Sequence, residues 1–334
     1  MPTGVFMHSI IEESALRDFW YPVIPIEDLE NGPSAFTLLG EKMVLWLDAE
    51  GQPAAIRDRC NHRYAQLSLG KTADGLVLCP YHGWRFDRMG KCINISQAKK
   101  TVSRCDVDPF HCQAAYGYAW VCLGQPRSEI PFFPEEHDPG FRRIHCFYET
   151  WNANPIRVME NELDMSHFPF VHDGTFGDNA AVNPIEYEVY DRGSQGVGVH
   201  AVLDVKADDL QAANTKMDKG KSCRTMAIEW YIPFTIRLAI SYSSGLEHVI
   251  INNAVPMENG EIKILQFHFR NDREEQVSVE QLLAFERRIV AEDRRVIESI
   301  DPNLPLDPAR EAHIPTDRAG LLMRDKLFKL FQSS

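Results

Sequence analysis

Two pairs of cysteine and histidine constrain this chain more than any other feature. Cys60 and His62 form a Cys-x-His pair, and Cys79 and His82 form a Cys-x-x-His pair, with sixteen residues between His62 and Cys79. Two thiolates and two imidazoles from two short loops supply enough ligands to enclose one metal centre. The chain must therefore fold so that these two loops meet.

Two kinds of metal centre use such ligands. In a Rieske-type [2Fe–2S] cluster, one iron would be held by Cys60 and Cys79 and the other by His62 and His82. The alternative is a tetrahedral zinc site, which the same four residues could make, although zinc ligands usually have other spacings. The spacing therefore favours the cluster and leaves zinc open.

The two loops also carry a family resemblance. The segments CNHR and CPYHGW resemble the cluster loops of the Rieske non-haem iron oxygenases, the family of the aromatic-ring-hydroxylating dioxygenase α subunits. Respiratory Rieske proteins have extra cysteines that staple these loops, whereas the corresponding residues here are not cysteine. Trp84, which has no hydroxyl group, follows Gly83. Without the staple and a hydroxyl donor the reduced cluster is less stabilised, which implies a lower potential, suited to oxygen chemistry.

A second group of metal-binding residue types follows the first. Asn161, Asp164 and His167 recur every three residues, the spacing of one side of a helix. His172 comes five residues after His167, and we expect Pro169 to end that helix and let the chain turn His172 back toward His167. A single histidine is more often an ordinary hydrogen-bonded residue. Two histidines brought together beside a carboxylate instead indicate a 2-His-1-carboxylate iron(II) site.

The pattern Asn-x-x-Asp-x-x-His-x4-His resembles the mononuclear-iron motif of the same family. The resemblance implies that His167 and His172 bind the iron and that Asn161 and Asp164 are catalytic residues beside it. It also implies that Asp164 bridges to a cluster histidine of a neighbouring subunit in a homotrimer.

The third iron ligand is expected on a long C-terminal helix. Ser278 and Gln281 form a capping box ahead of an apolar stripe, and Asp293 lies on that stripe. A carboxylate in a core is costly unless a cation meets it. The segment AEDRRVIES resembles the family's third-ligand segment, with Asp293 at the ligand position. Three glutamates of the helix are expected to be solvated: Glu286, Glu292 and Glu298.

The alternation of apolar and polar residues in the rest of the chain, together with the helices described above, predicts an α+β fold. From residue 35, short alternating segments bounded by Gly, Pro and Asp predict an all-β N-terminal domain, including a turn at residues 48–52. Residues 181–270 predict an antiparallel sheet, and residues 206–224 lack periodicity and predict a loop. Three histidines in these strands are expected to be structural: His200, His248 and His268. We assign residues 1–150 to an N-terminal segment and Rieske domain and residues 151–334 to a mononuclear-iron domain. The resemblance implies that helices flank the sheet of the latter, as in helix-grip (START-like) domains.

Composition excludes several classes of partner. The net charge of −13 argues against nucleic acid and anionic membrane surfaces, and no segment has the apolar length of a membrane span. The N-terminal segment lacks the apolar core of a signal peptide, so a cytoplasmic location is expected.

Six cysteines outside the cluster pattern are expected to be buried free thiols: Cys92, Cys105, Cys112, Cys122, Cys146 and Cys223.

The resemblance spans nearly the whole chain and implies an O2-dependent oxygenase that receives electrons from a separate NAD(P)H-dependent reductase or ferredoxin. The chain looks most like the purine-alkaloid N-demethylases and guanidinium-toxin hydroxylases, which act on small ring compounds. Asn252, in the segment HVIINNAVP, is expected to contact the substrate through its amide. An electron carrier that uses only the cluster is the alternative, although it would not need the second motif. Demethylation and hydroxylation without loss of carbon both stay open.

Overall fold

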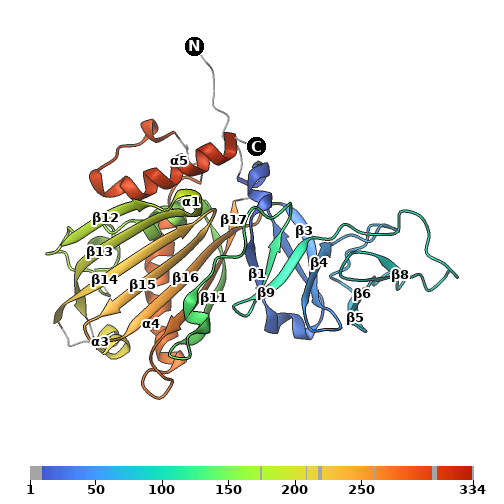
Figure 1. The fold of residues 1–334 in the computed structure, drawn as a ribbon, viewed down its shortest axis with the longest axis horizontal. Coiled ribbons are helices and arrows are strands. Elements are labelled where there is room, and N and C mark those ends of the chain that lie inside the picture. The colour runs from blue at the N-terminus through green and yellow to red at the C-terminus, as the bar shows by residue number, and fades with distance from the viewer. Residues whose placement is uncertain are drawn as a thin grey trace, which may run out of the picture. The chain divides into compact units, whose positions relative to one another are not determined.

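The computed structural model describes residues 10–173, 175–207, 209–216, 220–258, 260–302 and 307–332. These residues form two compact units, one with residues 10–130 and 255–258 and the other with residues 131–254 and 260–332. The domain boundary expected between residues 150 and 151 stays a prediction. Both units are drawn in Figure 1.

The first unit is all-β, as the sequence predicts. Its strands form three antiparallel sheets with the orders β1-β10-β9, β2-β3-β4 and β5-β6-β7-β8. The strands are β1 (Tyr21–Pro25), β2 (Ser34–Leu38), β3 (Glu41–Leu47), β4 (Pro53–Arg57), β5 (Lys71–Ala73), β6 (Leu76–Leu78), β7 (Arg85–Phe86), β8 (Cys92–Asn94), β9 (His111–Ala115) and β10 (Tyr118–Cys122). Short 3-10 helices lie before and after β1 in the chain: η1 (Ile10–Glu12), η2 (Ser14–Asp18) and η3 (Ile26–Asn31).

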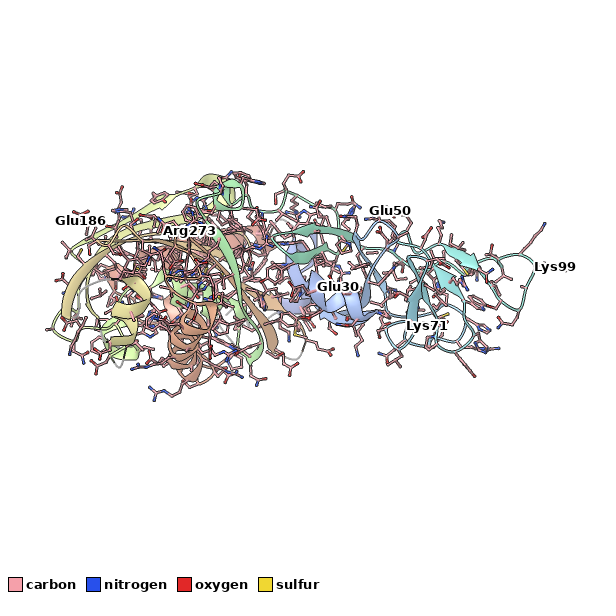
Figure 2. The ribbon with its side chains drawn as sticks, turned by 90° about the horizontal axis from the view of Figure 1, so that it is seen from below. Glu30, Glu50, Lys71, Lys99, Glu186 and Arg273 are labelled. Carbon is pink, nitrogen blue, oxygen red and sulfur yellow. The ribbon has the colours of Figure 1, made fainter. Side chains whose placement is uncertain are left out.

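The predicted turn at residues 48–52 closes the β3–β4 hairpin. The Asp48 Oδ1 atom accepts hydrogen bonds from the backbone N–H groups of Glu50 and Gln52, at 3.1 and 2.8 Å. Gly51 has a φ of +72°, which only glycine adopts without strain. Figure 2 labels Glu50 in this turn and Lys71 at the start of β5, the first strand of the sheet β5-β6-β7-β8.

The second unit is organised around one antiparallel sheet of seven strands in the order β11-β17-β16-β15-β14-β13-β12. The strands are β11 (Arg142–Asn152), β12 (Glu186–Asp191), β13 (Gly196–Ala207), β14 (Gly220–Tyr231), β15 (Thr235–Tyr242), β16 (Glu247–Pro256) and β17 (Glu261–Arg270). Because successive residues of a strand face opposite sides, every second residue of β14 to β17 faces the helices that cover one side of the sheet.

The helices of the second unit position the metal-binding motif. They are α1 (Pro155–Leu163), α2 (Phe168–Val171), α3 (Asp209–Thr215), α4 (Val279–Ile297) and α5 (Arg318–Gln332), with 3-10 helices η4 (Pro134–His137), η5 (Gly193–Gln195), η6 (Pro308–Arg310) and η7 (Pro315–Asp317). Helix α4 lies on one face of the sheet and contacts α1, α2, α3 and β11, whereas α5 packs against β12, β13 and α1 (Figure 1). Ser278 caps α4 as predicted, since its hydroxyl accepts a hydrogen bond from the Gln281 N–H at 3.1 Å. The predicted α+β fold is confirmed.

The loop predicted for residues 206–224 is wrong. Strand β13 continues to Ala207, helix α3 follows, and β14 starts at Gly220. The helix buries polar side chains, Gln211, Asn214 and Thr215, each 1% exposed, so it has no apolar periodicity that the sequence could reveal. Cys223 is exposed rather than buried, because it alternates with the buried Arg224 along β14.

Candidate metal centres

The two predicted cluster loops adjoin strands of the sheet β5-β6-β7-β8 in the first unit. Cys60 and His62 follow β4, and Cys79 and His82 lie in the β6–β7 connection. Both cysteines are buried, Cys60 at 1% and Cys79 at 3% exposure, whereas both histidines are half-buried. Their Nδ1 atoms are 3.1 Å apart. The indole of Trp84 stacks on the His62 ring at 4.6 Å and 6°, which fixes the orientation of that imidazole.

These four residues fit a two-iron cluster better than a single zinc ion. Among the described residues, the donor groups that gather within 4.8 Å of one another do not include them. A buried sulfur pair and a separate, outward imidazole pair instead match one iron held by two thiolates and another by two imidazoles. Burial raises the pKa of the Cys60 thiol to about 11, so a metal must displace its proton.

The second motif lies at a break between two helices. Asn154 caps α1, its Oδ1 atom accepting from the Ile156 N–H at 2.9 Å, and α1 ends at Leu163. Asp164 then has extended backbone, and His167 is the N-cap of α2. The prediction that Pro169 ends the helix is therefore wrong. Pro169 lies in the first turn of α2, where a missing N–H costs no helical hydrogen bond.

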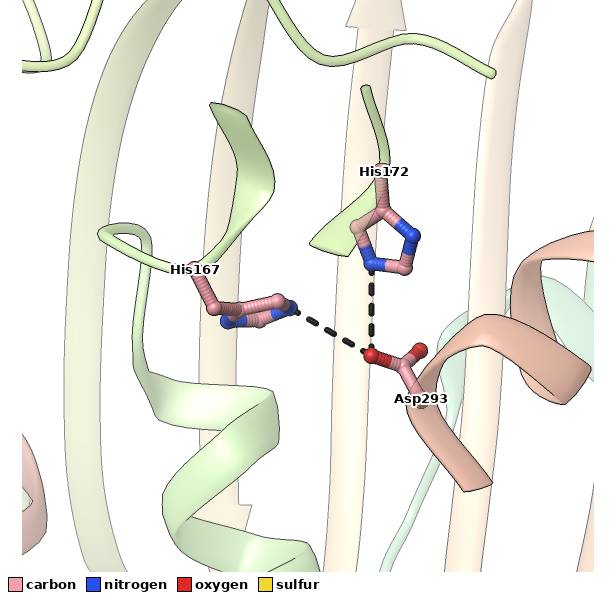
Figure 3. A group of neighbouring side chains, drawn as sticks. All are labelled: His167, His172 and Asp293. Atoms are coloured by element: carbon pink, nitrogen blue, oxygen red, sulfur yellow. Dashed lines mark ion pairs between the residues drawn. The ribbon is translucent and has the colours of Figure 1, made fainter. Parts of the chain in front are cut away.

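The break brings the two histidines together with Asp293 of α4. The Asp293 Oδ1 atom lies 3.5 Å from His167 Nε2 and 3.3 Å from His172 Nε2, and the three donor atoms lie within 4.8 Å of one another (Figure 3). Asn161 donates a hydrogen bond from Nδ2 to the same Asp293 oxygen at 3.2 Å. Two imidazoles and one carboxylate on one side of an ion are the donor set that iron(II) oxygenases use.

The other ring nitrogen of each histidine faces a carboxylate. His172 Nδ1 is 2.8 Å from Glu292 Oε2, and His167 Nδ1 is 3.4 Å from Asp164 Oδ2. A proton held on Nδ1 by a carboxylate leaves Nε2 as a lone pair directed at the ion. Burial alone would lower the pKa of His172, but hydrogen bonds and charge from Asp293 and Glu292 outweigh it and raise that pKa.

Asp164 is fixed in place by its own loop. Burial alone would raise the pKa of its carboxyl group, but hydrogen bonds from His167 and Ser166 outweigh burial and lower that pKa. The backbone N–H groups of Ser166 and His167 donate to its two oxygens at 2.8 and 3.1 Å. Asp164 is thus a carboxylate that orients His167 within the chain.

Two glutamates of α4 were expected to need only solvent, and the structure corrects both. Glu286 is 3% exposed, and burial raises its pKa to about 7. Glu292 contacts His172 and also accepts from the Thr175 hydroxyl at 2.9 Å. Glu286 precedes Asp293 by seven residues, two helical turns, so helical spacing predicts that both face the same side. Helical spacing does not predict a buried contact for Glu292, which immediately precedes Asp293 in the chain.

A cavity of the second unit opens onto the three donor atoms. Its lining combines His167, His172 and Asp293 with aromatic and aliphatic side chains of the sheet and α4, and it includes Asn252. Asn252 is 6% exposed and donates from Nδ2 to Glu162 Oε1, while its Oδ1 has no partner among the described residues. Burial, with the charge of Asp293, raises the pKa of Glu162 to about 7.

His248 and His268 form a buried pair on strands β16 and β17. His248 Nε2 and His268 Nδ1 are 2.7 Å apart, and Glu286 adds a third donor atom within 4.8 Å. Burial lowers the pKa of His268 to about 3, with a further decrease from the charge of Arg270. Burial also lowers the pKa of His248, with a further decrease from the charge of His268. The hydrogen bond between the two rings satisfies one nitrogen of each, whereas His268 Nε2 has no partner among the described residues.

Family profiles match both units. The Rieske [2Fe-2S] domain matches residues 19–111, and the Vanillate O-demethylase oxygenase C-terminal domain matches residues 151–332. The chain belongs to the Rieske non-haem iron oxygenase family. Methylxanthine N1-demethylase NdmA of Pseudomonas putida is 33% identical over 332 residues, covering 96% of this chain and 90% of that protein. Methylxanthine N3-demethylase NdmB of the same organism is 29% identical, covering 94% and 89%.

Solved structures agree with these matches. The structure of NdmA from Pseudomonas putida CBB5 with caffeine has a TM-score of 0.81 at 31% identity, covering 96% of this oxygenase and 93% of that chain. Dicamba monooxygenase bound to 3,6-dichlorosalicylic acid has a TM-score of 0.83 at 22% identity, which shows the shared fold. The electron-carrier alternative is excluded, because the second unit is an oxygenase domain.

The family assignment also settles the cofactors. The protein is an enzyme with a [2Fe–2S] Rieske domain and an oxygenase domain of the kind that binds mononuclear iron, and the zinc alternative is wrong. Enzymes of this family use small-molecule substrates and take electrons from a reductase or ferredoxin. No helix in the described ranges is long and apolar enough to cross a membrane.

Proposed function

We propose that this oxygenase removes a methyl group from nitrogen or oxygen of a small ring compound, with His167, His172 and Asp293 as the ligands of its mononuclear iron. The proposal rests on one observation: their three donor atoms converge at the wall of a cavity lined by aromatic and amide side chains. The relatives that match over nearly the whole chain are named as N-demethylases.

The residues around these ligands have separate tasks. Iron(II), when bound, supplies the activation of O2 for attack on the substrate. Asn161 holds the Asp293 oxygen that faces both histidines, and Glu292 and Asp164 hold the Nδ1 protons of His172 and His167. The partial or full burial of His167, His172 and Asp293 limits the access of water to the site.

Asn252 is the proposed contact for a ring carbonyl or ring N–H. Its unpartnered Oδ1 accepts from a donor on the substrate, and its Nδ2 turns to a substrate acceptor when Glu162 is protonated. A burial-raised pKa of about 7 for Glu162 makes both states accessible near neutral pH.

Turnover with a panel of methylated rings tests this function. The purified protein, supplied with a reductase, is incubated with caffeine, theobromine and methoxylated benzoates while O2 uptake and formaldehyde are measured. Formaldehyde in proportion to O2 supports demethylation, whereas an oxygenated product without formaldehyde supports hydroxylation. If a preparation with about three irons per chain gave neither product with any ring compound, the proposal would be wrong.

We also propose that the Rieske cluster is ligated by Cys60, His62, Cys79 and His82, and that it reduces the mononuclear iron of a neighbouring chain in a cyclic homotrimer. The resemblance on which this rests assigns Asp164 as the bridge to a cluster histidine of the neighbouring chain. The half-buried cluster histidines support it, since they remain accessible to another chain.

Complementation separates the routes within and between chains. A His82→Ala chain lacks the cluster, and a His167→Ala chain lacks the mononuclear iron. Mixed oligomers should recover activity that neither parent has, and Asp164→Asn should suppress this recovery without emptying either metal site. Mixed oligomers that hold both centres and stay inactive would count against transfer between chains.

A further inference from the structure

Arg224 places a guanidinium group in the wall of the cavity. It lies on β14 at 5% exposure, and its Nε atom has no hydrogen-bond partner among the described residues. Its Cζ atom lies 4.2 Å from the centre of the Phe176 ring and 5.2 Å from that of Phe168. Two aromatic faces hold the cation, but they do not neutralise it.

The other deeply buried arginines differ from Arg224. Arg270 is 0% exposed and pairs with Asp272 at 2.5 Å, and Arg324 is 2% exposed and pairs with Glu160 and Glu311. No carboxylate oxygen of the described residues lies within ion-pair distance of Arg224. A buried cation is retained without a partner only at a high cost, so an arginine left unpaired inside a cavity marks the place of an anion.

Glu286 is the carboxyl group whose charge acts on Arg224, but the two side chains do not form an ion pair. Burial raises its pKa to about 7, although the charges of Arg270 and Arg224 lower it. Burial also lowers the pKa of Arg224, and interaction with the Tyr242 hydroxyl opposes that effect. No ion pair joins Glu286 to Arg224 among the described residues, which leaves the guanidinium available to a ligand.

Arg224 is also close to the proposed iron site. The Phe176 ring that lies under its guanidinium stacks on the His172 imidazole, with ring centres 4.6 Å apart. One aromatic ring therefore separates the cation from an iron ligand. A six-membered ring of the substrate bound in the cavity can present an anionic group to Arg224 and its opposite edge to the iron.

We propose that Arg224 binds a carboxylate on the ring substrate, so that this enzyme prefers ring carboxylates to neutral rings. The inference rests on the proposed function, and it names the substrate class of the same cavity. Planar guanidinium and carboxylate groups form paired, charge-assisted hydrogen bonds, which are the strongest that a buried arginine offers. Asn252 lies toward the other end of the cavity, since Arg224 pairs with Tyr242 and Asn252 with Ile236 on β15.

Equilibrium binding to the iron-loaded protein, without reductase, tests the preference. The probes are 4-methoxybenzoate and 4-methoxybenzamide, which have nearly the same shape and differ in charge. The wild type should bind the acid more tightly than the amide. Arg224→Gln should weaken binding of the acid by about 10- to 100-fold and that of the amide by less than about threefold, as expected for a lost charge-assisted bond.

Two further variants serve as controls for this result. Arg224→Lys keeps the charge but not the planar fork, so its affinity for the acid should fall between those of the wild type and Arg224→Gln. This variant decides the question if Arg224→Gln does not fold, which the far-UV circular dichroism of its seven-stranded sheet reports. Met226→Leu, two residues along the same strand and also in the cavity wall, should keep the wild-type ratio of acid to amide affinity.

The inference fails if the wild type binds the amide as tightly as the acid, if it binds neither, or if Arg224→Gln keeps the wild-type ratio. Each of these outcomes leaves turnover of neutral rings untouched, so the proposed function could still hold. Conversely, selective binding of the acid without product from any ring compound would overturn the proposed function and leave the role of Arg224 in place.

Discussion

The contact between Glu292 and His172 gives a direct test of how this protein holds its mononuclear iron. Glu292 Oε2 accepts from His172 Nδ1 at 2.8 Å and from the Thr175 hydroxyl at 2.9 Å, in a site where His172 is 1% exposed. Removing such a partner of a metal-bound histidine costs about 10- to 100-fold in metal affinity. Glu292→Gln keeps an acceptor oxygen but loses the charge, so we expect about a tenfold loss. Glu292→Ala should approach 100-fold.

Competition with an iron(II) chelator measures this loss. The absorbance of the [2Fe–2S] cluster gives the protein concentration in the same sample, because Glu292 lies in the other unit. Glu280→Gln is the matched control, since it removes an exposed charge from the first turn of the same helix. Wild-type iron affinity in Glu292→Ala would show that the carboxylate does not fix the His172 tautomer, and the assignment of Nε2 as the ligand atom would lose its support.

Three other substitutions separate the two centres and the cavity. Asp293→Asn should lower the iron content by about one per chain and leave the cluster spectrum unchanged, because one charged ligand of three is lost; full iron content with normal turnover would remove Asp293 from the ligand set. His82→Ala should abolish the brown colour of the cluster and keep mononuclear iron, and a retained cluster spectrum would contradict its assignment. Asn252→Ala should raise KM about tenfold without a change in iron loading, and unchanged kinetics would exclude Asn252 from the pocket.

Much of the site was accessible from the sequence because the ligands lie in short, local motifs. One residue separates Cys60 from His62, and two residues separate Cys79 from His82. Because the members of each pair lie on the same short loop, both can contact one metal centre whatever the rest of the fold is. Asp293 was found in another way, as a charge on an apolar helical stripe within a segment that resembles the family's third-ligand segment. Local spacing, one violated pattern and the family resemblance together identified the candidate ligands, and hydrophobic patterning identified the all-β and antiparallel parts of the fold.

The errors come from positions where burial is not apolar. Helix α3 buries the polar side chains of Gln211 and Asn214, so the segment has no apolar periodicity and looked like a loop. Arg224 fell within that same segment, and its place in the cavity could not be inferred until β14 was known to begin at Gly220. Pro169 was misjudged because a proline that ends one helix and a proline that begins another share the same local signal.

The geometry of α4 connects the metal site with the proposed recognition of the substrate. Glu286 and Asp293 face the cavity two helical turns apart, which is about 10 Å at a rise of about 1.5 Å per residue. Glu286 is near Arg224, whereas Asp293 is near His167 and His172, the histidines of the proposed iron site. The Phe176 ring already separates Arg224 from His172. Helix α4 therefore reaches both parts of the cavity, with Glu286 near the guanidinium proposed to recognise the substrate and Asp293 at the proposed iron site. Substitutions at the Glu286 end should change which ring compounds bind, and substitutions at the Asp293 end should change whether iron is bound.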